Sequence, residues 1–151
     1  MTLYLEDFAP GETYTSVGRT VTEADIMGFA GVSGDFNQLH INEQWVTDNT
    51  PFRGRIAHGL LVLAISSGLA TPGMEDVETI AYLEASRKFT GPTYPGDTIH
   101  TVTTVVDTRP SRSRPGMGVL TTTVDVVNQH GEVVQTGTDA VMITCRPTEG
   151  G

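Results

Sequence analysis

The sequence predicts an α+β fold in which one long buried helix packs against an antiparallel sheet of about five strands. Residues 56–70 are almost continuously apolar and contain no Asp, Glu, Lys or Arg, as expected for a helix buried on every side. The segments after residue 77 are instead rich in Thr and Val, which is typical of strands. A sheet of that size can cover such a helix, and 151 residues fit a single domain spanning 1–151.

The N-terminal third predicts one strand followed by two short helices. Residues 13–21 are rich in Thr and Val and indicate a strand. Thr22 and Asp25 have the spacing of a capping box, so a helix is expected to begin there and to end at Gly31 or Gly34. A second short helix is expected over residues 43–48.

The C-terminal half predicts a series of long strands joined by turns. Strands are expected over residues 79–89, 98–106, 119–127 and 132–145. Residues 92–96 and 128–131 have the Gly, Pro and Asn content of turns, and 110–118 (PSRSRPGMG) reads as a loop.

Composition argues against several classes of partner. The formal net charge is −9 and the pI is about 4.7, which disfavours nucleic acid and anionic membrane surfaces. The longest unbroken apolar run covers only residues 60–65, far short of the ~20 residues that span a bilayer. Cys145 is the only cysteine, and residues 1–12 do not resemble a signal peptide. A cytoplasmic protein is therefore expected.

Polar groups gather immediately before the apolar helix. Asp35, Asn37 and His40 lie in the segment GDFNQLH, and His58 precedes Gly59 in RIAHG. A carboxylate and an imidazole in one cleft are suited to general acid–base chemistry. A Gly59 N–H in the first turn of the helix would point outward, with the positive end of the helix behind it, where it could hold a developing oxyanion.

Structural roles remain open for the same residues. Asp35 or Asn37 could cap a helix or form an Asx turn, and His58 could be a packing or capping residue. Ser67 would ordinarily bond a carbonyl one turn back in its helix. The four histidines show no metal-ligand spacing, so no metal site is expected.

Two motifs together carry a resemblance to a known family. The D-x-N-x-x-H motif over residues 35–40 and the H-G pair at 58–59 resemble the signature of MaoC-like dehydratases, the (R)-specific enoyl-CoA hydratases of hotdog fold. The segments YLEDFAPGETY, KFTGPTYPGDTI and SRSRPGMG are also similar to that family, so the resemblance covers essentially the whole chain. One departure is Gln38, where the family usually has Pro.

The resemblance implies a role for each matching residue. Asp35 and His40 match the dyad that holds the water, and the Gly59 N–H matches the group that receives the thioester oxygen. Asn37, His58 and Ser67 match positions that support the site. The implied reaction is (R)-specific hydration of an enoyl-CoA, or dehydration of a 3-hydroxyacyl-CoA, by a homodimer without a further cofactor. The acyl group and the physiological direction stay open.

Two other functions compete with hydration. A hotdog acyl-CoA thioesterase would usually place a carboxylate on the central helix, and residues 56–70 contain none. A non-catalytic acyl-CoA-binding subunit would be expected to lack the dyad.

Five of the nine basic residues lie between positions 87 and 114. Arg112 and Arg114 in the SRSRP loop are the expected contacts for the phosphates of CoA, although a solvated loop would look the same.

Overall fold

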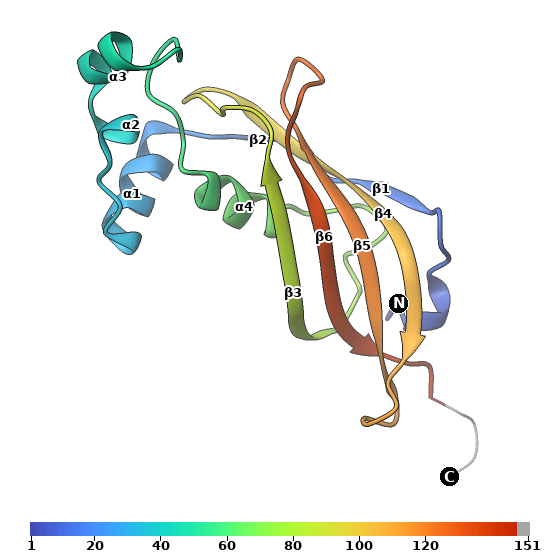
Figure 1. The fold of residues 1–151 in the computed structure, drawn as a ribbon. Helices are drawn as coiled ribbons and strands as arrows, with labels where there is room; N and C mark the ends of the chain where they lie inside the picture. The colour runs from blue at the N-terminus through green and yellow to red at the C-terminus, as the bar shows by residue number, and fades with distance from the viewer. Residues whose placement is uncertain (148–151) are drawn as a thin grey trace.

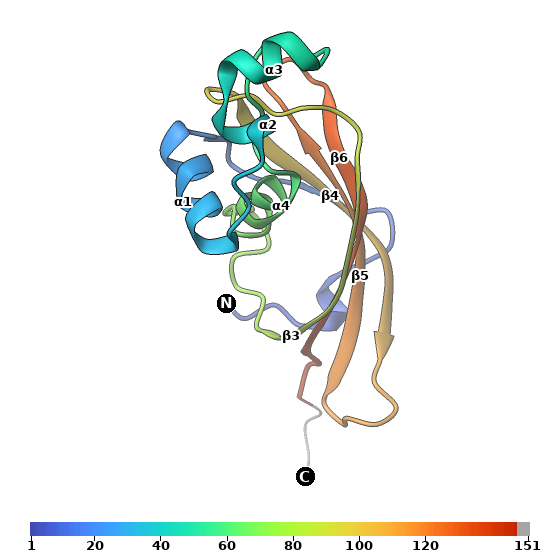
Figure 2. The same ribbon diagram turned by 60° about the vertical axis from the view of Figure 1, so that its left-hand side comes forward.

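A computed structural model describes residues 1–147 of the chain. A curved antiparallel sheet forms one layer, and four α-helices gather over the concave side of one of its ends (Figures 1 and 2). A 3₁₀ turn, Leu5–Asp7, precedes the first strand. Helix α4 lies between the sheet and α1, so the helix expected to pack against the sheet does so (Figure 2).

Four long strands make up most of the sheet. They are β3 (Thr79–Phe89), β4 (Thr98–Pro110), β5 (Met117–Val127) and β6 (Val133–Thr144). Their order with the first short strand is β1-β4-β5-β6-β3, so β3 is an edge strand. All four were predicted, β3 with its observed bounds. The β4–β5 hairpin extends further than predicted, leaving only residues 111–116 as its loop.

The single strand predicted over residues 13–21 is wrong. Two short strands stand there, β1 (Thr13–Thr15) and β2 (Arg19–Thr20), and both pair with β4. The strand breaks because the Val17 N–H donates to the carbonyl of Ala70, outside the sheet. This hydrogen bond joins the segment between β1 and β2 to the residues that follow the central helix.

The capping signals place the first helix correctly. Helix α1 covers Glu23–Ser33; Asp25 N–H donates to Thr22 Oγ1, and Thr22 N–H donates to the Asp25 carboxylate. Gly34 ends the helix with a φ of 76°, a left-handed conformation that glycine adopts without strain. Helix α3 covers Glu43–Asn49, close to the prediction, whereas the one-turn helix α2 (Gln38–Ile41) was not predicted.

The central helix α4 is shorter than predicted, covering Gly59–Ser67 rather than 56–70. It begins late because Ile56 and Ala57 donate their N–H groups to the carbonyls of Leu39 and Thr93, which lie outside the helix. The prediction that every face is buried is also wrong, since Leu60 is 62% exposed. Within residues 1–147 no helix has the length and apolarity needed to cross a bilayer.

The buried apolar side chains form two clusters. One lies under α4 and joins Leu61, Val62 and Ile65 to Ile99 and Val126 of the sheet. The other lies at the opposite end, around Leu5, Phe8 and Leu120. The first cluster fixes α4 on the sheet and thereby fixes the segment that precedes it.

Candidate active site

The segment between α1 and α3 brings Asp35 and His40 next to the start of α4. Asp35 N–H donates to Ser33 Oγ (3.1 Å), and the Asp35 carboxylate accepts from Asn37 N–H (3.1 Å). Asn37 Oδ1 accepts from Leu39 N–H (3.0 Å) and so caps α2. These local bonds leave Asp35 Oδ2 facing His40 Nε2 at 3.9 Å. Asn37 therefore performs the capping role that the sequence left open.

A carbonyl fixes the tautomer of His40. The side chain is 9% exposed, and Nδ1 lies 2.7 Å from the Ile56 carbonyl oxygen. Since a carbonyl only accepts, Nδ1 carries the hydrogen, and Nε2 of the neutral ring presents a lone pair toward Asp35. Burial lowers the pKa of His40 below its usual 6.5. The hydrogen bond to Ile56 opposes this lowering, the nearby His58 adds to it, and the charge of Asp35 opposes it.

Asp35 Oδ2 and His40 Nε2 are thus two hydrogen-bond acceptors that could bind the same water molecule. The two atoms are 3.9 Å apart, too far for a direct hydrogen bond. The space suits a water molecule that donates one hydrogen to the carboxylate and one to the imidazole. A water held in this way has both its protons in contact with groups that can accept them.

His58 contacts both members of this pair. Its Nε2 donates to the main-chain carbonyl of Asp35 at 2.9 Å, and its ring stacks on His40 with centroids 3.7 Å apart. Phe29 packs on His58 with ring centroids 4.9 Å apart. Although His58 stands at the N-cap of α4, its side chain makes no capping bond. His58 therefore holds Asp35 and His40 in place rather than capping the helix.

Asp35, His40 and His58 also bring three potential metal ligands within 4.8 Å of one another. A zinc ligand must point a ring nitrogen at the ion from about 2.0–2.1 Å, in the plane of the ring. The two imidazole planes are only 26° apart and stacked, and His58 Nε2 already binds a carbonyl. The donor set does not fit a metal ion.

The start of α4 supplies unpaired N–H groups. Among the described residues none accepts a hydrogen bond from Gly59 N–H, while the Gly59 carbonyl accepts from Gln135 Nε2 at 2.7 Å. A Cβ on Gly59 would stand 2.7 Å from the Phe89 ring, which explains the need for glycine. Gly59, Phe89 and Gln135 line a cavity of about 360 Å³. The position suits a carbonyl oxygen that gains negative charge.

The remaining predicted residues lie elsewhere. Ser67 is eight residues further along α4, about 12 Å away, and donates to the Ala64 carbonyl at 2.7 Å. Arg112 and Arg114 are exposed in the β4–β5 loop, at the end of the sheet opposite to α2 and α3 (Figure 1). Within one chain the structure therefore does not bring these arginines to Asp35 and His40.

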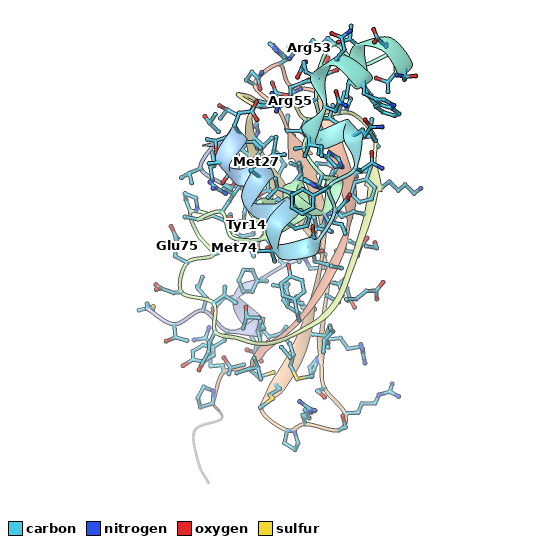
Figure 3. All side chains as sticks on the ribbon, turned by 90° about the vertical axis from the view of Figure 1, so that its left-hand side faces the viewer. Tyr14, Met27, Arg53, Arg55, Met74 and Glu75 are labelled. Carbon is cyan, nitrogen blue, oxygen red and sulfur yellow. The ribbon has the colours of Figure 1, made fainter. Side chains whose placement is uncertain are left out.

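Sequence reasoning missed three contributors to the site: Phe29, Phe89 and Gln135. Gln135 reaches Gly59 across 76 residues, and Phe89 belongs to the edge strand. Their residue types are ordinary for a helix or a strand, so no local pattern could have identified them. Arg53 and Arg55 lie at the end of the molecule that carries the helices (Figure 3). Both are occupied: Arg55 pairs with Glu23 and Glu43, and Arg53 stacks on Tyr94.

Comparison with known proteins identifies the family of the chain. The MaoC-like domain model matches residues 7–128. The chain is 35% identical over 146 residues to the (R)-specific enoyl-CoA hydratase of Rhodospirillum rubrum, covering 95% of this chain and 93% of the relative. It is 31% identical over 135 residues to the 3-hydroxybutyryl-CoA dehydratase of Methylorubrum extorquens, covering 87% and 82%.

Solved structures agree on the fold. The MaoC-like dehydratase of Rhodospirillum rubrum superimposes with a TM-score of 0.77 at 33% identity, over 97% of this chain and 99% of that one. A double-hotdog protein of Mycobacterium tuberculosis gives a TM-score of 0.83 at 20% identity over 99% of this chain and 46% of its own, a likeness of fold alone. With a family model over most of its length and relatives above 30% identity, the chain belongs to the MaoC-like dehydratases of hotdog fold.

Proposed function

We propose that the protein adds water to an enoyl-CoA thioester, or removes it from the 3-hydroxyacyl-CoA, with Asp35 and His40 holding the water. The observation that carries this proposal is the pair of acceptors, Asp35 Oδ2 and His40 Nε2, 3.9 Å apart. The Gly59 N–H, which has no partner among residues 1–147, follows directly after His58, whose ring stacks on His40. The names of the relatives support the reaction class, and the name of the Rhodospirillum rubrum relative supports the (R) preference.

The reaction needs one water and no other reagent. The water oxygen bonds to C3 as one of its O–H bonds breaks, and the electron pair of the C2=C3 bond moves through C2 onto the thioester oxygen. A proton then passes to C2 through the Asp35–His40 pair, which returns to its starting state. We treat the pair as one acid–base unit because interacting groups titrate jointly.

Two contributions to the rate can be given magnitudes. Positioned proton transfer by the pair is worth typically 10²- to 10⁴-fold. The Gly59 N–H would stabilise the enolate oxygen, and loss of a comparable donor costs about 3–4 kcal/mol. The tautomer of His40 supports this assignment, since its Nε2 is free to accept a proton from water.

One incubation with crotonyl-CoA separates hydration from its competitors. Loss of the enoyl absorbance without free thiol is the expected result. Release of free CoA thiol would instead indicate a thioesterase, and α4 carries no carboxylate that favours this reaction. Binding without either change would indicate an acyl-CoA-binding subunit and would contradict the proposal.

We further propose that two chains pair edge to edge through β3. This strand lies at the edge of the sheet, and a long unprotected edge is a template for pairing. Leu60 on α4 is 62% exposed, an apolar surface that a second copy would cover. Light scattering at micromolar concentration should give a dimer, and Leu60→Glu should weaken it more than the control Val32→Glu. A wild-type monomer would contradict this assembly.

Such pairing would also give Arg112 and Arg114 a role. Antiparallel pairing of two β3 strands reverses the partner sheet, so its β4–β5 loop comes to the end where Gly59 lies. The arginines would then meet CoA phosphates bound at the site of the other chain. Joint Arg112→Ala and Arg114→Ala substitutions should raise KM and weaken its salt dependence, with kcat nearly unchanged. An unaltered KM would show that the loop is only solvated.

A further inference from the structure

A second cavity lies beyond the dyad, between the end of α4, the segment that follows it and the sheet. Its volume is about 430 Å³. Met74 and Glu75, which line it, belong to the segment that leads from α4 to β3 (Figure 3). Apolar residues supply part of the wall, but hydroxyl groups face the same space from both the helix and the sheet. The polar lining consists chiefly of Ser66, Tyr82, Thr101, Thr103, Thr122 and Asp139.

Three of the threonines that line this wall have side-chain hydroxyls without a hydrogen-bond partner among residues 1–147. Thr101, Thr103 and Thr122 are 3%, 9% and 6% exposed. Within residues 1–147 their hydroxyls make no hydrogen bond, and all three lie on strands that face the cavity. A buried hydroxyl without a partner costs about 1–3 kcal/mol, so a hydrocarbon ligand would leave this wall unsatisfied. A ligand with its own hydroxyl would satisfy it.

The charge of Asp139 is balanced by Arg87. The Asp139 carboxylate accepts from Arg87 Nη1 (2.6 Å) and Nη2 (2.9 Å) and from the Tyr82 hydroxyl (2.9 Å). Burial and the nearby Asp139 charge raise the pKa of Tyr82 to about 12, which keeps its proton in place. Glu75 is the other charged residue of the lining. With Arg87 already paired, the cavity offers no free cation to a carboxylate.

The cavity is within reach of a thioester held at Gly59. Ser67, on its wall, is eight residues along α4, which is about 12 Å. A fully extended chain advances roughly 1.2 Å per bond, so a medium-length acyl chain spans this distance. On β6, Gln135 lines the Gly59 cavity and Asp139 lines this one, with Gly137 between them. Arg87, the register partner of Gly137, extends its buried side chain to Asp139 at this place, so an acyl chain would pass along α4 beside it.

We infer that this cavity binds the far end of the acyl chain and favours an acyl group that carries a neutral hydroxyl. The inference rests on the proposed hydratase function and names its substrate class. The hydroxyl would donate to Asp139 or a threonine and accept from another threonine. A plain alkyl end would leave buried hydroxyls unpaired, and a carboxylate end would meet Asp139 and Glu75.

Three thioesters of equal chain length test the inference: trans-2-octenoyl-CoA, its 8-hydroxy derivative and trans-2-octenedioyl-CoA. The hydroxy substrate should have a kcat/KM at least ten-fold above that of octenoyl-CoA, and the dicarboxylate should have the lowest. Joint Thr103→Val and Thr122→Val substitutions should abolish the preference. Thr121→Val, on the opposite face of β5, is the matched control and should keep it.

The acyl chain of crotonyl-CoA is too short to reach the cavity, so this substrate measures hydratase activity without any contribution from the cavity. If it is hydrated while octenoyl-CoA matches the hydroxy substrate, or while the double Val variant keeps the preference, the cavity assignment is overturned. If none of the thioesters is hydrated, the proposed function fails and the inference fails with it. Inhibition by 8-hydroxyoctanoyl-CoA against octanoyl-CoA gives a second measurement, with ten-fold tighter inhibition by the hydroxy compound expected.

Discussion

The imidazoles of His40 and His58 stack with centroids 3.7 Å apart and 26° between their planes. His58 also binds the Asp35 carbonyl, so one side chain holds both members of the dyad. The stacking explains why His40 keeps a fixed orientation toward Asp35, although α2 is only one turn long. The dyad is thus positioned from the start of α4, and the same turn presents the Gly59 N–H.

The first prediction concerns the pH dependence of the reaction. Activity needs neutral His40, and burial lowers the pKa of His40 below 6.5. The acid limb of kcat/KM should therefore fall below pH 6.5. Because the unfolded chain binds this proton more readily than the native one, stability should also decline as the pH drops below 6.5. A kcat/KM profile and urea unfolding at several pH values check both, and an acid limb above 6.5 would contradict the burial argument.

The second prediction concerns His58. His58→Phe keeps a ring against His40 but loses the hydrogen bond to Asp35, so the dyad should shift. We expect kcat to fall roughly 100-fold, which is the loss that a misplacement of the catalytic groups by about 1 Å can cause, with little change in KM. The acid limb should move to higher pH, since His58 contributes to the lowered pKa of His40. Steady-state kinetics check this, with His130→Phe in the exposed β5–β6 turn as control. An unchanged kcat would show that His58 does not position Asp35 and His40.

The third prediction concerns Gly59 and Phe89. An alanine Cβ at position 59 would stand 2.7–2.8 Å from the ring of Phe89, so either the ring or the helix start must move. Gly59→Ala should lose about 1–3 kcal/mol of stability and most of its activity. Adding Phe89→Leu should restore stability more than activity. Thermal melts with kinetics on both variants check this, and a fully active Gly59→Ala would refute a role for the tight approach.

The fourth prediction concerns the buried pair of Arg87 and Asp139, whose side chains are 2% and 10% exposed. Arg87→Met would leave a buried carboxylate with Tyr82 alone and should cost about 3–5 kcal/mol. Arg19→Met, which breaks an exposed pair with Asp25, should cost about 0–1 kcal/mol. Adding Asp139→Leu to Arg87→Met should recover most of the loss. Urea unfolding measures all three, and equal losses for the two single variants would contradict this account.

The sequence predicted those features that depend on neighbouring residues. Thr22 and Asp25 predicted the start of α1, and the Thr- and Val-rich segments predicted the four long strands. The end of α1 was predicted at Gly31 or Gly34 and lies at Gly34. The segments 35–40 and 58–59, far apart in the sequence, lie next to each other in the structure. Contacts between residues that are distant in the sequence became visible only in the folded structure.

Contacts distant in sequence were beyond prediction. The bond from Gln135 to Gly59 spans 76 residues, and the pairing of Arg87 with Asp139 spans 52. Helix α2 is too short for any periodic signal. The exposed face of α4 was missed because an apolar sequence does not reveal whether its own chain or a second copy covers it.

The central claim, that Asp35 and His40 together activate water, has one direct measurement. Purified wild type, Asp35→Asn, His40→Gln and the surface control Asp48→Asn are each incubated with crotonyl-CoA while the enoyl absorbance is followed, and circular dichroism verifies their folding. Wild type and Asp48→Asn should hydrate the substrate, whereas both dyad variants should be folded and inactive. Full hydratase activity in either folded dyad variant would contradict the account.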